Sequence, residues 1–173
     1  MKKILLISDS HSWLDEKLIK HINDCDEIWH AGDIGNDDFI NFITKLKPLI
    51  AVFGNIDGQS IRLKFPENNI FFCDGVKVLI THIGGYPGKY PTRVKNLLEI
   101  HKPSIYINGH SHILKVIYDK AFNLLYLNPG ACGIQGFHNI KTALKFNICG
   151  KEIKNLAIIE LGKRNEQSKN VLL

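Results

Sequence analysis

The sequence predicts one α/β domain in which two mixed β-sheets pack face to face with helices outside, a four-layer αββα arrangement. The first half of the chain alternates strand and helix patterns, which implies parallel strands joined by right-handed crossovers. Beyond residue 66 the pattern becomes rich in strands. The first two of these flank Asp74 and Gly75, a residue pair typical of a tight hairpin turn.

The first half contains three expected strands and two expected helices. Residues 3–8 are nearly all apolar, which is typical of a strand buried on both faces. Residues 13–25 carry leucine and isoleucine at a spacing of three to four, an amphipathic helix pattern. A strand follows at 27–31, and a helix at 36–47 begins with Asn and Asp, which cap free N–H groups. A third strand covers 49–54.

The second half adds one helix among short strands. We expect the helix at 91–102 and strands at 69–73, 76–81, 104–108, 115–119, 124–128, 142–148 and 154–161. A single domain should therefore cover residues 1–162. The tail at 163–173 is polar, and we expect it to fray.

Composition excludes several classes of protein. No apolar run reaches about 18 residues, and polar residues come too early for a secretory leader, so we expect a cytoplasmic protein without a membrane partner. The formal charge is +5, but lysines are scattered and only three arginines occur, which argues against sequence-specific DNA reading. Four scattered cysteines without a CxxC pair predict reduced, mostly buried thiols.

Polar residues follow five of the predicted strands at their carboxyl ends, where ligands gather in open α/β sheets. Taken singly, each has a structural explanation: a helix N-cap, an ordinary turn or a buried histidine. Taken together, five independent turns would each have to select a metal-ligand residue type by chance. The residues are Asp9, His11, Asp33, Asn55, Asp57, His82, His110 and His112.

The order and spacing of these motifs resemble the calcineurin-like metallophosphoesterase superfamily. The order is D-x-H, G-D, G-N-x-D, H and G-H-x-H, with 20 residues between His11 and Gly32 and 20 between Asp33 and Gly54. The short chain and the late NPGA sequence at 128–131 are similar to the small YfcE-type phosphodiesterases, which in turn resemble the retromer subunit Vps29. The resemblance covers residues 3 to about 160.

The resemblance implies a dinuclear metal centre that hydrolyses phosphodiesters through a hydroxide shared by both ions. A mixed set of nitrogen and oxygen donors without thiolate suits Mn²⁺, Zn²⁺, Fe²⁺ or Ni²⁺ better than Cu(I), and the four histidines argue against Mg²⁺ and Ca²⁺. Among the suitable ions we expect Mn²⁺. By the resemblance, Asp33, Asn55 and His110 take part in catalysis and Asp57 orients other groups. The first metal would be held by Asp9, His11 and His112, the second by Asn55, His82 and His110, and Asp33 would bridge them.

The spacing of the paired ligand residues and the position of His30 can also be interpreted. Asp9 and His11, like His110 and His112, are one residue apart, and alternation along an extended strand exit would point both members of a pair the same way. His30 either orients ligands or is a plain strand-end residue.

The leaving-group acid is missing from its usual position. The larger family places a histidine directly after the motif asparagine, whereas this chain has Ile56, which cannot donate a proton. The acid is therefore unknown, and the candidates are a metal-bound water or His138, which can equally be structural. An enzyme of this kind should prefer esters with good leaving groups.

Substrate contacts are expected from Asn55 and from the loop after His82, which contains Gly84, Lys89 and Arg93. The two tyrosines of this loop either stack on a base or belong to an ordinary surface loop capped by Thr92. The main alternative function is a non-catalytic scaffold in the manner of Vps29. A nucleic-acid-binding module is less favoured, and the oligomeric state stays open.

Overall fold

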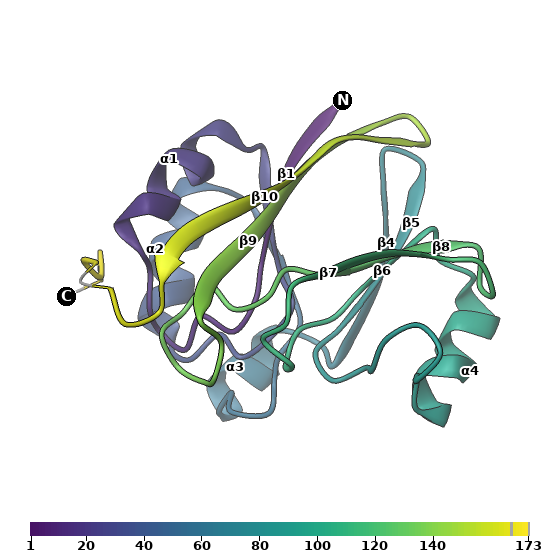
Figure 1. Cartoon of the computed structure of the whole chain (residues 1–173), viewed down its shortest axis with the longest axis horizontal. Coiled ribbons are helices and arrows are strands. Elements are labelled where there is room, and N and C mark those ends of the chain that lie inside the picture. The colour runs from purple at the N-terminus through teal and green to yellow at the C-terminus, as the bar shows by residue number, and fades with distance from the viewer. Residues whose placement is uncertain (167, 173) are drawn as a thin grey trace.

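A computed structural model describes residues 1–166 and 168–172 and shows two five-stranded mixed sheets packed between helices (Figure 1). The predicted fold class is confirmed. The elements are β1 (Lys2–Ile7), α1 (Glu16–Asp24), β2 (Glu27–His30), α2 (Asp37–Leu46), β3 (Leu49–Ala51), α3 (Gln59–Lys64), β4 (Asn68–Cys73), β5 (Val76–Thr81), α4 (Thr92–His101), β6 (Ile105–Ile107), β7 (Lys115–Asp119), β8 (Leu124–Asn128), β9 (Ile140–Cys149) and β10 (Glu152–Lys163).

The strand order divides the chain between the sheets. The first sheet runs β10-β9-β1-β2-β3, with β1, β2 and β3 parallel as predicted and β9 antiparallel to β1. The second sheet runs β4-β5-β6-β8-β7, with β5, β6 and β8 parallel. The parallel strands of each sheet therefore end at one edge of that sheet.

Alternation along β1 builds two cores. Leu5 and Ile7 face the helices α1 and α2, whereas Ile4 and Leu6 face the second sheet. All four are buried, which explains why the strand is apolar throughout. Helix α4 covers the outer face of the second sheet through a third cluster that includes Leu98. Figure 1 shows α1 and α2 on one side of the molecule and α4 on the other.

The structure departs from the predicted elements in several places, most clearly at α1, β3, α3 and α4. Helix α1 begins at Glu16 rather than at residue 13, because Asp15 is its N-cap and accepts a hydrogen bond from the backbone N of Lys17. Strand β3 ends at Ala51, three residues early. The short helix α3 was not expected. Thr92 does not cap α4, whose N-cap is Pro91, without a side-chain hydrogen bond.

The polar tail contacts both the segment before α1 and strand β9. Asn170 accepts a hydrogen bond from the backbone N of Leu14, and Ser168 accepts one from the buried ammonium of Lys141. Of the tail predicted to fray, residues 167 and 173 lie outside the described part of the chain. The fraying itself stays a prediction.

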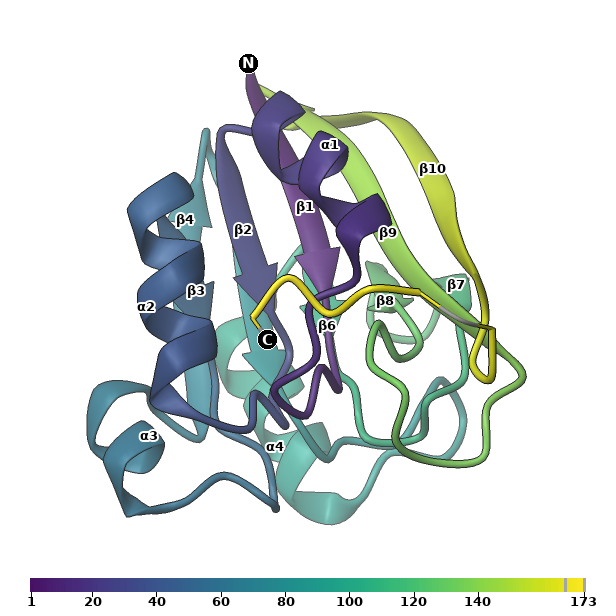
Figure 2. The ribbon, with the colours of Figure 1, turned by 90° about the vertical axis from the view of Figure 1, so that its left-hand side faces the viewer.

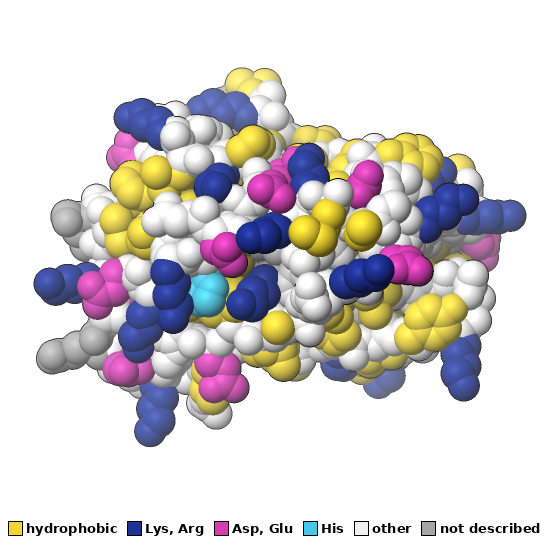
Figure 3. Space-filling model, turned by 90° about the horizontal axis from the view of Figure 1, so that it is seen from above, with side chains coloured by type: hydrophobic (Ala, Val, Ile, Leu, Met, Phe, Trp, Pro, Cys, Tyr) yellow, Lys and Arg dark blue, Asp and Glu magenta, His cyan; other side chains and the backbone are white. Residues whose placement is uncertain are grey.

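Charged side chains are mixed on the surface. On the face in Figure 3, lysine and arginine alternate with aspartate and glutamate and do not form one basic patch. Within residues 1–166 and 168–172, no helix combines the length and apolar character needed to cross a membrane. The cysteines of this part are free thiols, three of them buried, as the sequence predicted.

Candidate metal centre

The candidate ligands gather where parallel strands of both sheets end. Figure 2 shows β1 and β2 running side by side toward one edge, where their connecting loops meet. The loop after β1 carries Asp9 and His11, the loop after β2 carries Asp33, the loop after β3 carries Asn55, the loop after β5 carries His82, and the loop after β6 carries His110 and His112.

Six of these residues form two groups that could each hold a metal ion. In each group the donor atoms lie within 4.8 Å of one another. The first group contains the three residues expected for the first metal, and the second contains His82 and His110 together with Asp33. The two groups are Asp9, His11 and His112, and Asp33, His82 and His110.

The carboxylate of Asp33, a member of the second group, also approaches the first group. Its Oδ2 is 3.6 Å from Nε2 of His11, and its Oδ1 is 3.2 Å from Nε2 of His82. The amide Oδ1 of Asn55 is 3.1 Å from the same Nε2 of His82. Asp33 thus presents one oxygen to each group, which is the position of a bridging ligand.

Four buried side-chain atoms lack hydrogen-bond partners among the described residues, and two of these atoms are potential metal donors. The two donors are Oδ1 of Asp9, a fully buried carboxylate, and Nε2 of His11. Oδ1 of Asp9 lies 3.2 Å from Nε2 of His112, and Nε2 of His11 lies 3.6 Å from Oδ2 of Asp33, although neither contact is a hydrogen bond. Buried polar atoms are nearly always paired, and a bound cation would satisfy both of these atoms. A divalent cation fits this arrangement, because it accepts imidazole nitrogen and carboxylate oxygen together.

The backbone of five candidate ligands is left-handed. Asp9, His11, Asp33, His110 and His112 have φ between 46° and 65°. Such conformations are uncommon outside glycine and concentrate at functional sites. The explanation by strand alternation is therefore wrong, because β1 ends at Ile7 and β6 at Ile107. Tight turns, rather than extended backbone, aim each pair.

Hydrogen bonds orient two of the imidazoles. His82 donates from Nδ1 to the carbonyl of Ala31 at 2.8 Å, which leaves its Nε2 toward Asp33. Nδ1 of His112 is 3.3 Å from Nδ1 of His138, whose Nε2 donates to the carbonyl of Gly133 at 3.0 Å. His138 therefore accepts through Nδ1 and keeps Nε2 of His112 free. Both ring nitrogens of His138 are engaged, which argues against its use as an acid.

His30 and Asp57 lie behind the ligands. His30 accepts a hydrogen bond at Nδ1 from the backbone N of Gly32, and its Nε2 donates to Oγ of Ser10. Burial lowers the pKa of His30 to about 4, so the ring is neutral near pH 7. Asp57 accepts from the backbone N atoms of Ile34, Gly35 and Gly54. Both residues thus join the turns that carry ligands.

Asn128 is the first residue of the NPGA sequence, and its hydrogen-bonding role was not predicted from the sequence. Its Nδ2 donates to Oδ1 of Asn108, to the carbonyl of Gly109 and to Oγ of Ser111. These bonds fix the turn from which His110 and His112 project. The asparagine within a Pro-Gly turn was the available signal.

The carboxylates change the electrostatics of the second group. Burial alone would lower the pKa of His82, but a hydrogen bond to Asp33 and the charge of Asp9 outweigh it and raise that pKa. Burial would likewise raise the pKa of Asp33, yet His82 and a hydrogen bond from the backbone N of Ile56 lower it. Both shifts follow from the close approach of the Asp33 carboxylate to the His82 ring.

The expected substrate residues divide between two places. Asn55 and Arg93 line one pocket of 440 Å³ together with His82. Gly84 lines a neighbouring hollow beside His110. Lys89 lines neither of these pockets, and its Nζ is 5.8 Å from the ring centre of Tyr86.

Tyr90 is not available for stacking on a base. It is 6% exposed, and its hydroxyl donates to Asp119. That part of the proposed loop is core, because the ring packs with Tyr106 and Phe122.

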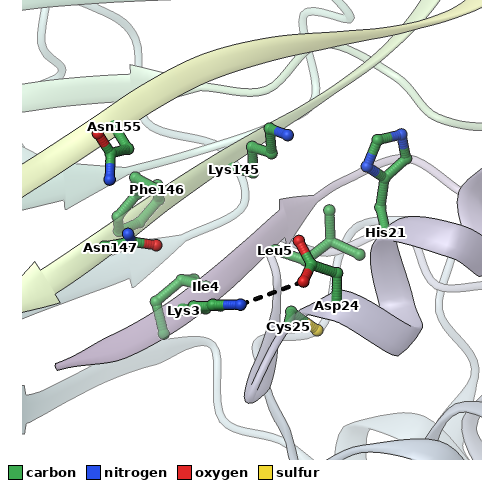
Figure 4. A pocket seen from close by; sticks show the side chains of 10 residues that line it. All are labelled: Lys3, Ile4, Leu5, His21, Asp24, Cys25, Lys145, Phe146, Asn147 and Asn155. Carbon is green, nitrogen blue, oxygen red and sulfur yellow. Dashed lines mark hydrogen bonds and ion pairs between the residues drawn. The ribbon is translucent and has the colours of Figure 1, made fainter.

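A smaller pocket of 170 Å³ lies away from this centre (Figure 4). It is lined by α1 and by the strands β1 and β9, near the start of β1, whereas the metal-ligand groups follow its carboxyl end. The ammonium of Lys3 is already paired with Asp24 at 3.1 Å.

Comparisons with known proteins agree with this geometry. Residues 1–151 match the family model described as the calcineurin-like phosphoesterase superfamily domain. A probable metallophosphoesterase of Methanocaldococcus jannaschii is 26% identical over 132 residues, which cover 73% of this chain and 66% of that protein, just under two thirds of its length.

Solved structures share the fold. A single mutant of Vps29 from Entamoeba histolytica superposes with a TM-score of 0.72 at 15% identity, covering 91% of this chain and 98% of that one. A predicted phosphoesterase from Streptococcus pneumoniae gives 0.70 at 19% identity, covering 97% and 95%. An archaeal phosphodiesterase gives 0.65 at 21% identity, covering 91% and 99%.

Proposed function

This chain belongs to the calcineurin-like phosphoesterase superfamily, and from that premise we propose that it is a metal-dependent phosphodiesterase with a dinuclear centre. The observation that carries the proposal is the pair of donor groups, which the Asp33 carboxylate connects through its contacts with His11 and His82. The substrate class is a small or nucleotide-like phosphodiester.

The candidate ligands would hold two cations in the proposed centre. Two divalent cations held there would supply positive charge at the phosphoryl oxygens and lower the pKa of water for attack. We assign Mn²⁺ first, with Zn²⁺, Fe²⁺ or Ni²⁺ as substitutes, because imidazole and carboxylate donors suit all of them. The first cation would be held by Asp9, His11 and His112, the second by Asn55, His82 and His110, and both by Asp33.

The protein itself contributes positions and fixed charges. His138 and the carbonyl of Ala31 fix two imidazoles with Nε2 toward the centre. Asp57 joins the turns after β2 and β3, so that Asp33 and Asn55 keep their relative positions. Preorganised donors of this kind need little rearrangement during reaction.

The leaving group receives little help from the described side chains. Ile56 occupies the position after Asn55 and is 44% exposed, and its side chain has no proton to give. His138 is engaged at both nitrogens. Esters with leaving groups of low pKa should therefore react fastest.

A second candidate function is a protein-binding scaffold. The edge strand β7 exposes Val116, Ile117 and Tyr118, at 40%, 37% and 57%. An exposed apolar edge strand is a common site of protein contact. A scaffold, however, has no need of two orphaned buried donor atoms among seven ligand-type residues, so the enzyme is favoured.

Metal analysis together with a screen of esters tests the proposal. The purified protein should bind close to two Mn²⁺ ions per chain and hydrolyse aryl phosphodiesters only when a divalent ion is present. Asp33→Asn should reduce both metal occupancy and turnover. If the protein bound no divalent ion and turned over no mono- or diester with any of the four metals, the enzyme assignment would be wrong.

A further inference from the structure

Two of the three arginines of the chain line the same pocket as the candidate ligands Asn55 and His82. We propose that this pocket binds a second phosphate group of the substrate, next to the phosphate that reacts. The proposal rests on the proposed function and adds the class of substrate: a phosphoester that carries another phosphate on the same molecule. Arg62 and Arg93 are the residues that would recognise it.

Arg62 is held in place by the turn that carries Asn55. Its Nε donates to the carbonyl of Asp57 at 2.7 Å, and its Nη2 donates to the carbonyls of Gly54 and Asn55 at 3.1 and 3.3 Å. The guanidinium carbon lies 4.4 Å from the ring centre of Phe53. The side chain is therefore ordered before any ligand arrives, which reduces the entropy lost on binding.

Arg93 is held by the turn that carries His82. Its Nη2 donates to the carbonyl of Ile83 at 2.7 Å and is 3.5 Å from Oγ1 of Thr81. Its Nη1 donates to Oδ1 of Asn68 at 2.8 Å. Each arginine thus fastens one ligand-bearing turn by backbone contacts while it faces the shared pocket.

Both guanidinium groups keep donors for an anion. Within the described residues, Nη1 of Arg62 and Nε of Arg93 make no hydrogen bond to protein. Guanidinium stays charged at any physiological pH and forms paired hydrogen bonds to phosphate oxygens. Two such groups at one pocket are a better fit to phosphate than to a neutral group.

One carboxylate opposes this charge. Glu67 lines the pocket and is 3.6 Å from Nη1 of Arg93, but its side chain is 58% exposed and can swing into solvent. The three charged side chains leave a net positive charge. Glu67→Gln should therefore strengthen binding of a second phosphate.

The pocket is large enough for more than the reacting phosphate. Its 440 Å³ lie within the range of small-molecule sites, roughly 300 to 1,000 Å³. The reacting phosphate belongs at the donor groups beside Asp33. Asn55, His82 and both arginines line this one pocket, so a substrate whose reacting phosphate lies at the donor groups can also present a second phosphate to the guanidinium groups.

Binding of non-hydrolysable phosphonates separates this proposal from turnover. Calorimetry with the Mn²⁺-loaded protein would compare linear alkane bisphosphonates, with three to six methylenes between their phosphonates, with alkyl monophosphonates of the same lengths. At least one bisphosphonate should bind roughly tenfold more tightly than its monophosphonate, the gain expected from new charge-assisted hydrogen bonds. A twofold gain is expected merely from having two equivalent ends.

The measured quantity is the affinity of each bisphosphonate divided by that of the monophosphonate of the same length. Damage to the metal centre weakens the binding of both ligands alike and so leaves this ratio unchanged. Arg62→Gln with Arg93→Gln should reduce the ratio to about two. Lys115→Gln is the matched control, since it removes one positive charge from the neighbouring hollow beside His110 and should leave the ratio unchanged.

Three results would overturn the second phosphate site. They are a wild-type ratio near two at every length, a ratio that survives loss of both arginines, and an equal fall in the Lys115→Gln protein. None of them depends on hydrolysis, so an inactive protein would refute the proposed function alone. An active protein with a ratio near two would refute this inference alone.

Discussion

Replacing Gly54 by alanine should dismantle the metal centre while leaving the fold intact. A Cβ atom on Gly54 would overlap both Oδ1 and the backbone N of Asp33. The backbone atom cannot swing away as a side-chain end can, so Asp33 would have to retreat by more than about 1 Å to restore ordinary contact. Metal sites tolerate only about 0.2 Å of change in their ligand distances.

The expected losses follow from that displacement. Gly54→Ala should bind fewer than two Mn²⁺ ions per chain and should lose roughly 100-fold in kcat/KM, the effect of a misplacement of about 1 Å. The free energy of unfolding of the metal-free protein should fall by about 1 to 3 kcal/mol, as for other overpacked sites. Mass spectrometry of bound metal, initial rates with an aryl diester, and urea denaturation would measure these three quantities.

A matched control lies four residues away. A Cβ atom on Gly58 would meet nothing within 4 Å, and its φ of −75° suits alanine. Gly58→Ala should keep both metals and full activity. Wild-type metal content in Gly54→Ala, or an equal loss in Gly58→Ala, would show that the close approach to Asp33 does not set the ligand geometry.

Three further changes test other parts of the structure. His138→Ala should weaken metal binding by 10- to 100-fold, because the His112 imidazole then loses the hydrogen bond that orients it. The dependence of rate on leaving-group pKa should stay unchanged. His101→Ala, at the end of α4, is the control. Ile56→His should raise turnover of alkyl diesters at least about tenfold relative to aryl diesters, and equal gains for both would contradict the missing-acid explanation. Lys141→Met should lower the free energy of unfolding by about 3 to 5 kcal/mol, because it leaves the buried carboxylate of Asp15 without its cation. Adding Asp15→Leu should restore much of that free energy. Urea denaturation of the single and the double variant measures both effects.

Strand and helix patterns predicted the αββα layers, because buried positions are occupied by apolar residues at a spacing that differs between strands and helices. The run at 3–8 is apolar on both faces since β1 has a core on each side. The hairpin at Asp74 and Gly75 was equally readable, because both residues adopt positive φ there. Helix α3 was missed, since only six residues form it and only one of them, Ile61, is buried.

The kinds of residue in the two candidate donor groups could be read from the sequence, because metals select nitrogen and oxygen donors whatever the fold. Their orientation could not. The left-handed backbone at Asp9 and His110 differs from the extended conformation that strand alternation assumes. Hydrogen bonds between residues far apart in the chain, such as His138 with His112, depend on how the loops meet.

The sequence by itself determined the fold class, the order of the elements and the donor types, because periodicity and residue chemistry are local properties. The tertiary structure decided that β9 joins β1, that Asp33 presents one oxygen to each donor group, and that Arg62 and Arg93 share one pocket. These three features depend on contacts between residues far apart in the chain. A local sequence pattern does not specify which turns will lie next to each other.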